Sequence, residues 1–166
     1  MSRYAKIMPN DVVDGEGICV SFWVQGCPFH CEDCHNPDTW DFKSGKVYTD
    51  NTKWEIIKLL SLNNIERNFS VLGGEPLAPQ NVAMTLEVVK AVRSAYPSIT
   101  IFLWTGYVYD ELIQRGSDEI IEILNLIDIL IDGPYIKEQR NLNLRLRGSD
   151  NQHIWHKQNG IWEIEE

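Results

Sequence analysis

Three closely spaced cysteines are the residues of this chain best suited to chemistry. Cys27, Cys31 and Cys34 follow a CxxxCxxC spacing inside the segment CPFHCEDCHN. Glycine and proline on either side of the first cysteine let the backbone curl, so we expect the three thiolates to face a common centre. A four-iron cluster usually takes four cysteines, and three would leave one iron open to a substrate. The loop therefore predicts a 4Fe-4S cluster with an open coordination position.

The same loop could instead hold zinc. Short cysteine spacings occur in zinc sites as well, and Cys19, His30 or His35 could complete a tetrahedron of ligands. Cys19 lies within an apolar run typical of a strand, where a cysteine commonly serves as a small buried hydrophobic residue. We therefore do not expect Cys19 to bind the metal. The choice between zinc and iron depends on the rest of the chain.

Composition limits the possible partners and locations. The chain has 166 residues, 43% of them hydrophobic, and a formal charge of −9. This length fits a single domain covering residues 1–166, and the negative charge argues against nucleic-acid binding. The first residues lack the features of a signal peptide, and no apolar stretch reaches the length of a membrane span. We therefore expect a cytoplasmic protein with no membrane contact, reduced thiols, and small molecules or proteins as partners.

The hydrophobic pattern predicts alternating strands and helices. Apolar residues at helical spacing, or in short runs rich in β-branched residues, mark each element. The expected strands cover residues 3–8, 18–25, 69–72, 99–104 and 128–131, and the expected helices cover 52–62, 81–95, 109–114 and 118–126. This order indicates an α/β fold with a mainly parallel sheet and right-handed crossovers. Two apolar runs flank Asn159-Gly160, which predicts a C-terminal β-hairpin extension over residues 153–166.

The predicted strands place several motifs at one edge of the sheet. Ligands of parallel sheets bind at the carboxyl ends of the strands. The cysteine loop, Gly73-Gly74, Thr105-Gly106 and Asp132-Gly133 each follow a predicted strand. We therefore expect these four motifs to converge on one rim.

Two of the motifs together resemble a known superfamily. The cysteine segment resembles the signature of the radical S-adenosylmethionine superfamily, and Gly73-Gly74-Glu75-Pro76 is similar to its GGEP motif. The resemblance implies a partial, open (β/α) barrel in which S-adenosylmethionine binds the open iron through its amino and carboxylate groups. It also implies that residues 73–76 hold the amino group. Glycines admit a ligand close to the main chain, and a carboxylate such as Glu75 can accept a charge-assisted hydrogen bond. The agreement of two motifs favours iron over zinc.

Further motifs resemble one family within that superfamily. DGEG at 14–17, WTGY at 104–107, DGPY at 132–135 and the segment 147–152 are similar to those of anaerobic ribonucleoside-triphosphate reductase activating proteins. The resemblance implies a glycyl-radical activase, in which reductive cleavage of S-adenosylmethionine gives a 5′-deoxyadenosyl radical that takes hydrogen from a glycine of the large reductase subunit. It further implies that subunit as the partner, a reduced flavodoxin-like electron donor, and a homodimer or a heterotetramer with the reductase.

The nucleoside end of the expected site departs from the superfamily pattern. The residue before the third cysteine is often aromatic in the superfamily, whereas here it is Asp33. The backbone from Asp33 through Cys34 to His35, or the His35 ring, is therefore our candidate for contact with the nucleoside. Thr105 and Asp132 could bond the ribose or the carboxylate of the cofactor, and they could also serve as helix caps or turn formers.

Two other functions stay open on the sequence alone. One is a small radical enzyme of the same superfamily that acts on a nucleoside or a peptide. The other is a zinc-stabilised interaction module without turnover. Measuring whether the protein binds iron or zinc distinguishes an activase from the zinc module. Testing for association with a large glycyl-radical protein distinguishes an activase from the small radical enzyme.

Overall fold

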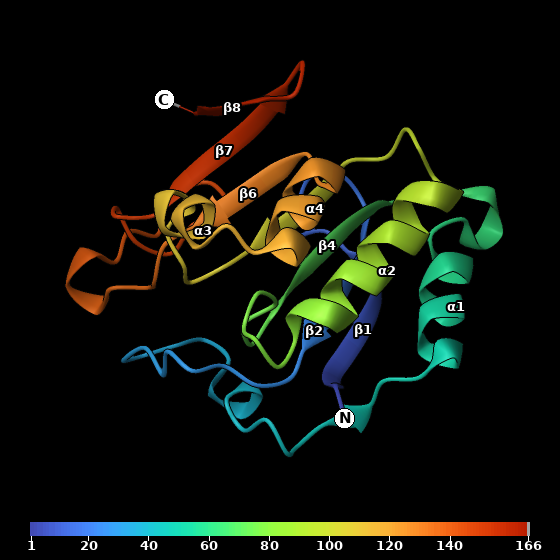
Figure 1. Ribbon diagram of the computed structural model, residues 1–166, viewed down its shortest axis with the longest axis horizontal. Helices are drawn as coiled ribbons and strands as arrows, with labels where there is room; N and C mark the ends of the chain where they lie inside the picture. Colours follow the sequence, from blue (N-terminus) through green and yellow to red (C-terminus); the bar gives the residue numbers. More distant parts are fainter. Residues whose placement is uncertain (166) are drawn as a thin grey trace.

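The computed structural model describes residues 1–165 and contains one eight-stranded sheet with four α-helices (Figure 1). The strands are β1 (Arg3–Asp11), β2 (Cys19–Val24), β3 (Lys46–Val47), β4 (Asn68–Gly73), β5 (Ile101–Trp104), β6 (Ile129–Asp132), β7 (His153–Gln158) and β8 (Ile161–Ile164). The helices are α1 (Asp50–Leu59), α2 (Val82–Ala95), α3 (Tyr109–Arg115) and α4 (Asp118–Leu126). None of the helices within residues 1–165 is long and apolar enough to cross a bilayer.

The sheet has a parallel centre and antiparallel flanks. Its strand order is β3-β1-β2-β4-β5-β6-β7-β8, and β2, β4, β5 and β6 pair in parallel. β1 and β7 run antiparallel to their neighbours, so the other six strands share one direction. The predicted α/β class with a mostly parallel sheet is thus confirmed. The antiparallel pairing of β1 with β2, the addition of the C-terminal hairpin to the same sheet and the two-residue strand β3 were not among the predicted features.

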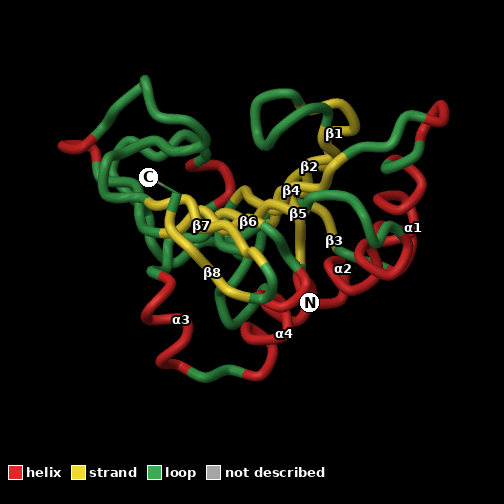
Figure 2. Tube along the Cα trace, turned by 90° about the horizontal axis from the view of Figure 1, so that it is seen from above, coloured by secondary structure: helices red, strands yellow, loops and turns green. Residues whose placement is uncertain are grey.

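The two faces of the sheet are covered differently. All four helices lie on one face, and loops cover the other (Figure 2). Phe22, Val71 and Leu103 belong to the large core cluster that includes residues of the helices. Phe102 and Ile131 belong to a second, smaller cluster on the loop side. Because both faces are buried, the central strands are mostly apolar, as parallel strands usually are, with Ser21, Ser70 and Asp132 as buried polar exceptions.

The segment between β1 and β2 closes the loop side of the sheet. Gly15 has a φ of +137°, and a Cβ there would lie 2.6 Å from Cys19 Sγ and 2.9 Å from Ser70 Oγ. Only glycine fits this conformation and this space. The DGEG motif therefore packs directly on the strands and forms one wall of the region beside them.

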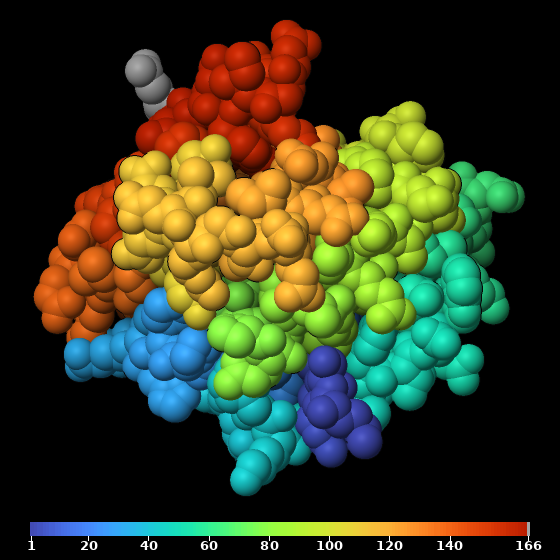
Figure 3. All heavy atoms as spheres, in the orientation of Figure 1, coloured from blue at the N-terminus to red at the C-terminus, as the bar shows by residue number. Residues whose placement is uncertain are grey.

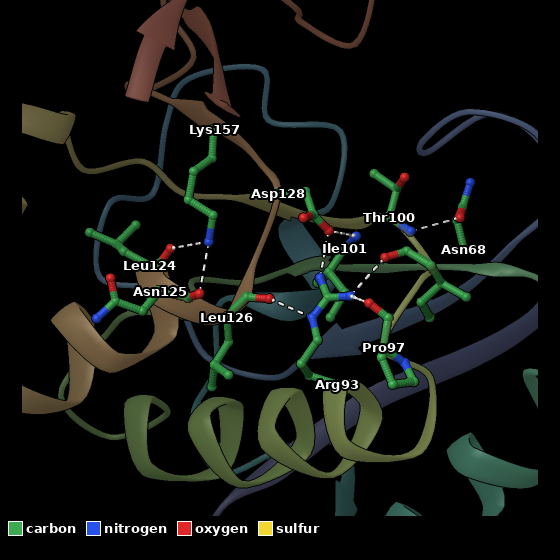
Figure 4. Close-up of polar contacts among 11 residues, drawn as sticks. Asn68, Arg93, Pro97, Thr100, Ile101, Leu124, Asn125, Leu126, Asp128 and Lys157 are labelled. Atoms are coloured by element: carbon green, nitrogen blue, oxygen red, sulfur yellow. Dashed lines mark hydrogen bonds and ion pairs between the residues drawn. The ribbon is translucent and has the colours of Figure 1, made fainter. Parts of the chain in front are cut away.

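A cluster of polar contacts holds the amino-terminal ends of strands β5 and β6 (Figure 4). Arg93 of α2 donates Nη2 to Asp128 Oδ2 at 2.5 Å, and the same carboxylate oxygen accepts from Ile101 N at 2.8 Å. The guanidinium also donates to three backbone carbonyls, those of Leu126, Pro97 and Ile99. This network joins the end of α2 to the starts of two strands, at the opposite end of those strands from the predicted motifs.

The predicted C-terminal hairpin is present and continues the central sheet. β7 pairs with β6, and β8 pairs with β7. Asn159 and Gly160, between the two strands, have φ angles of 53° and 77°. Two left-handed residues at the centre of a two-residue loop match the twist of the flanking strands. The last described residues are thereby held against the body of the protein.

Candidate functional site

A cavity of about 610 Å³ lies at the carboxyl ends of the parallel strands. Its walls come from the cysteine loop, from the turns after β4, β5 and β6, and from residues 144–152. Figure 1 shows the cysteine loop, in blue, on the same side of the sheet as the turn after β4 and the orange segment after β6. The space-filling view places the blue loop at the surface beside these two segments (Figure 3). The four motifs therefore meet at one rim.

The three cysteines of the loop face this cavity together. Cys27, Cys31 and Cys34 all line it, and each thiol is free and partly exposed. Burial raises the pKa of Cys27 to about 11, and burial also raises the pKa of Cys31. These two thiols are protonated near neutral pH unless a cation compensates their charge. A metal centre supplies that charge, since metal ligation displaces thiol protons.

The base of the cysteine loop is closed by the segment that follows it. Gly26 N donates to Thr39 O at 2.7 Å, and Cys27 N donates to Trp40 O at 3.1 Å. The buried Gln25 amide donates to the carbonyls of Asp38 and Asp41, each at 2.9 Å. These hydrogen bonds fix the two ends of the cysteine loop side by side. The thiols therefore project from a backbone whose ends are fixed.

Two of the three residues considered as a fourth zinc ligand, Cys19 and His30, make other contacts, whereas His35 lines the cavity together with the thiols. Within residues 1–165, no group of three His, Cys, Asp or Glu side chains is arranged to hold a single metal ion. Cys19 begins β2, at the opposite end of the strand from Cys27, and its Sγ contacts Glu16 O at 3.4 Å. The ring of His30 stacks on Trp40. Cys19 and His30 therefore have other contacts, as expected for Cys19.

The Gly73-Gly74 turn is packed directly against the cysteine loop. Gly73 has a φ of +112°, and a Cβ there would lie 2.8 Å from Val24 N and Val24 O. A Cβ on Gly74 would lie 2.3 Å from Gly26 O. Gly74 N donates to Val24 O at 3.0 Å and Glu75 N donates to Gly26 O at 2.8 Å. The main chain of Gly73 and Gly74, which carry no side chains, therefore faces the cavity next to the thiols.

Glu75 lines the cavity but is committed to protein donors. The side chain is 1% exposed. Its Oε1 accepts from Thr105 Oγ1 at 2.7 Å and from Leu77 N at 2.9 Å, and its Oε2 accepts from Gly106 N at 2.6 Å. Burial raises the pKa of Glu75 to about 7, while these three donors oppose the rise. Glu75 thereby joins the turn after β4 to the turn after β5.

Other predicted site residues divide between the cavity and its surroundings. Thr105 and His35 line the cavity, and the His35 ring lies 5.8 Å from the Tyr135 ring. Asp33 does not line it, and its carboxylate pairs with Lys137 Nζ at 3.4 Å. Neither do Pro76, whose carbonyl accepts from Thr85 Oγ1 at 2.8 Å, nor Asp132.

Asp132 supports the rim from below. It is fully buried, and it accepts from Tyr109 N at 2.7 Å and from His153 N at 3.2 Å. The first of these bonds gives a partner to the Tyr109 N–H at the start of α3, and the acceptor, Asp132, belongs to strand β6. The sequence left open whether Asp132 contacts the cofactor, caps a helix or forms a turn, and in the structure it caps α3.

The sequence did not indicate that several further residues line the cavity, although Trp104 and Arg147 belong to motifs that it singled out. Trp23, Leu72 and Trp104 form the wall on the sheet, and Leu144, Leu146 and Arg147 face them from the segment before β7. Because both faces of the strands are mostly apolar, alternation does not reveal which residues face the cavity. A left-handed leucine, Leu146 with φ 59°, also leaves no local sequence signal.

Comparisons with known proteins agree with this geometry. The 4Fe-4S single cluster domain family matches residues 13–155. The anaerobic ribonucleoside-triphosphate reductase-activating protein of Enterobacteria phage T4 is 38% identical over 161 residues, which is 97% of this chain and 98% of the phage protein. The proteins of the same name from Vibrio cholerae and Escherichia coli K12 are 39% and 36% identical, over 92% and 93% of this chain and 96% and 98% of their own lengths.

Proposed function

This chain belongs to the family of anaerobic ribonucleoside-triphosphate reductase-activating proteins, and we propose that it activates such a reductase as a radical S-adenosylmethionine enzyme. When bound and reduced by one electron, a 4Fe-4S cluster with S-adenosylmethionine would supply methionine and a 5′-deoxyadenosyl radical, which takes a hydrogen atom from a glycine of the large reductase subunit. One observation carries the proposal: three free thiols and a side-chain-free turn line the same cavity.

The residues of the cavity fit both cofactors. Cys27, Cys31 and Cys34 would hold three irons and leave the fourth open, as three-cysteine ligation implies. A cavity of about 610 Å³ lies within the range of small-molecule sites. We assign the amino group of S-adenosylmethionine to the main chain of Gly73 and Gly74. The charge of Glu75 beneath the turn would attract that ammonium while its oxygens keep Thr105 and Gly106 in place.

The nucleoside end is assigned to aromatic rings. His35 and Tyr135 line the cavity from opposite segments of the chain, one on the cysteine loop and one after β6. We propose that the adenine lies against one of these rings, with the backbone of Cys34 and His35 supplying polar contacts, whereas Asp33, also a candidate from the sequence, lies outside the cavity. Tyr135 thus takes the place of the aromatic residue that is absent at Asp33. Trp23, Trp104 and Leu144 would exclude water from the reacting atoms.

The fold agrees with this function. We interpret the four parallel strands, with helices on one face and the site at their carboxyl ends, as the partial (β/α) barrel of radical S-adenosylmethionine enzymes. The single-domain organisation, the cytoplasmic location, and the homodimer or heterotetramer with the reductase stay predictions. Sedimentation of the chain with and without the large subunit tests the assembly.

Anaerobic reconstitution tests the proposal. The loaded protein should show a reduced-cluster signal in electron paramagnetic resonance, and should convert S-adenosylmethionine to methionine and 5′-deoxyadenosine. Mixing with the large reductase subunit should produce a glycyl-radical signal on that subunit. A fully loaded, reduced protein that leaves S-adenosylmethionine intact would refute the proposal. One equivalent of zinc without iron or sulfide, in protein purified without oxygen, would favour an interaction module instead.

A further inference from the structure

The tip of the cysteine loop carries two acidic residues between two of the thiols. Glu32 and Asp33 separate Cys31 from Cys34, and both side chains are exposed. Asp33 has a φ of 59°, in the left-handed region that aspartate and asparagine adopt more readily than most residues. Neither acidic residue lines the reaction cavity. Contact with the cofactors therefore does not explain this acidic tip.

Negative charge beside these thiols opposes the reduction of a bound cluster. A 4Fe-4S cluster held by three thiolates is already negative, and reduction adds one more electron to it. The net charge around a cluster is one of the properties that set its reduction potential. Two carboxylates between two of the ligands would therefore make the cluster harder to reduce, unless a cation offsets them.

One lysine contacts both carboxylates. Lys137 Nζ lies 3.2 Å from Glu32 Oε1 and 3.4 Å from Asp33 Oδ2. Within residues 1–165, no other cationic side chain pairs with either carboxylate. Hydrogen bonds to Glu32 and then to Asp33 raise the pKa of Lys137, so its ammonium stays charged near neutral pH. Lys137 thus brings one positive charge to the tip of the loop.

The backbone that presents Lys137 is fixed beside the cysteine loop. Ile136 N donates to the hydroxyl of the buried Ser149 at 3.2 Å. One residue earlier, the backbone of Tyr135 hydrogen-bonds the Cys31 thiol and opposes the rise that burial causes in its pKa. The segment after β6 therefore contacts the loop both at a thiol and at the acidic tip.

We propose that Lys137 is a positioning residue for the cluster: it holds the acidic tip of the loop, offsets its charge, and thereby raises the reduction potential of the cluster that the three thiols bind. This inference rests on the proposed function, because only a bound cluster has such a potential. The role is electrostatic and does not require the pair to stabilise the fold, to which exposed ion pairs contribute little. Asp33 then has a function other than contact with the nucleoside.

Redox titration of the cluster-loaded protein, followed by electron paramagnetic resonance, tests this role. The variants are Lys137→Gln, Lys137→Arg, Asp33→Asn and the double variant Lys137→Gln/Asp33→Asn, compared at low ionic strength. Asparagine removes the charge at position 33 and suits the left-handed backbone. Lys90→Gln is the matched control, because Lys90 and Glu122 form an exposed ion pair of 2.8 Å between α2 and α4, on the helix-covered face. Iron analysis verifies that each variant is loaded.

The expected shifts have opposite signs. At a fixed solution potential, Lys137→Gln should lower the ratio of reduced to oxidised cluster about threefold, and Asp33→Asn should raise it by a similar factor, since water weakens charges near the surface without removing their effect. The double variant loses one charge of each sign and should return close to wild type, as should Lys137→Arg. High salt should shrink both single shifts by screening.

The possible outcomes separate this inference from the proposed function. Potentials equal to wild type in both Lys137→Gln and Asp33→Asn, or an equal shift in Lys90→Gln, would overturn the role of Lys137. If Lys137→Gln does not load, Asp33→Asn decides alone, and an unchanged or lower potential in that variant would overturn the role. A wild-type chain that assembles no cluster would instead refute the proposed function.

Discussion

Replacing Gly74 by alanine should separate two segments that hold the site together. A Cβ at this position would lie 2.3 Å from Gly26 O and 2.9 Å from Thr39 O, and ordinary contacts begin at 3.4 Å. Both atoms belong to the backbone, so no flexible side chain can move aside. The turn after β4 and the base of the cysteine loop must therefore move apart by about 1 Å.

The expected losses follow from this displacement. Overpacking a tight site costs about 1–3 kcal/mol, and the rigid neighbours place Gly74→Ala near the upper value. In a chain of this length each kcal/mol lowers Tm by roughly 2–4 °C, so about 3 kcal/mol corresponds to a fall of roughly 6–12 °C. Misplacement of a reacting group by about 1 Å can cost about 100-fold in rate. We therefore expect S-adenosylmethionine cleavage to fall by about that factor.

Two measurements check this prediction. Circular dichroism gives the Tm of the metal-free protein, and anaerobic reconstitution gives its iron content and its rate of 5′-deoxyadenosine formation. Gly116→Ala is the control, since Gly116 has a φ of +60° and an added Cβ would have nothing within 4 Å. It should lose roughly 1–2 kcal/mol of stability, the cost of a left-handed conformation for alanine, and keep full activity. Gly74→Ala with wild-type Tm and wild-type cleavage would refute the reasoning.

Three further predictions concern the thiols, Thr105 and Glu75. Cys27→Ala, Cys31→Ala and Cys34→Ala should each lose the cluster and all cleavage, whereas Cys19→Ala should keep its iron; equal iron loss in Cys19→Ala would contradict the ligand assignment. Thr105→Val removes the hydroxyl that donates to Glu75 and accepts from Tyr107 N, so urea unfolding should show a loss of about 1–3 kcal/mol, which Thr105→Ser largely restores. Because burial raises the pKa of Glu75 from 4.5 to about 7, the folded chain binds this proton more tightly than the unfolded chain. The stability that Glu75 contributes is then complete below about pH 4.5 and is lost as pH rises through about 7, by up to about 3 kcal/mol. Glu75→Gln should reduce the dependence of the unfolding free energy on pH between pH 5 and 7. Part of that dependence should remain, because the half-buried Asp14, with a pKa raised to about 7, acts in the same direction. A pH dependence equal to that of wild type would show that Glu75 does not titrate there.

The strands and the rim could be predicted because their signals are local. Apolar runs ending in glycine mark β4, β5 and β6, and parallel strands place those ends together. The helix boundaries were harder to predict, because they depend on capping hydrogen bonds that the spacing of apolar residues does not indicate. The expected helix at 52–62 is α1, Asp50–Leu59, which begins earlier because Thr49 and Thr52 form a capping box at its start. The exposed strand β3 depends on pairing with β1, which lies far away in the sequence.

The contacts of acidic site residues could not be predicted, because their partners are distant in the sequence. The resemblance assigns Glu75 to the ammonium of the cofactor, but its oxygens accept from Thr105 and Gly106, about thirty residues further along the chain. A helix cap was one of the roles considered for Asp132, but the sequence did not indicate that the capped helix would be α3, which precedes its strand in the chain. Such pairings follow from the crossovers, and no local pattern encodes them. The cysteine loop was easier because its ligands and its turn residues are contiguous.

The order of strands in the sheet has a consequence for how the protein matures. Apart from β3, strands that are neighbours in the sheet are consecutive in the chain. During synthesis from the N-terminus, each new strand can therefore add to an edge that already exists. The three thiols are complete by residue 34, but residues 144–152, which close the cavity, are made far later. All three thiols are therefore made well before the segment that completes the wall of the cavity around them.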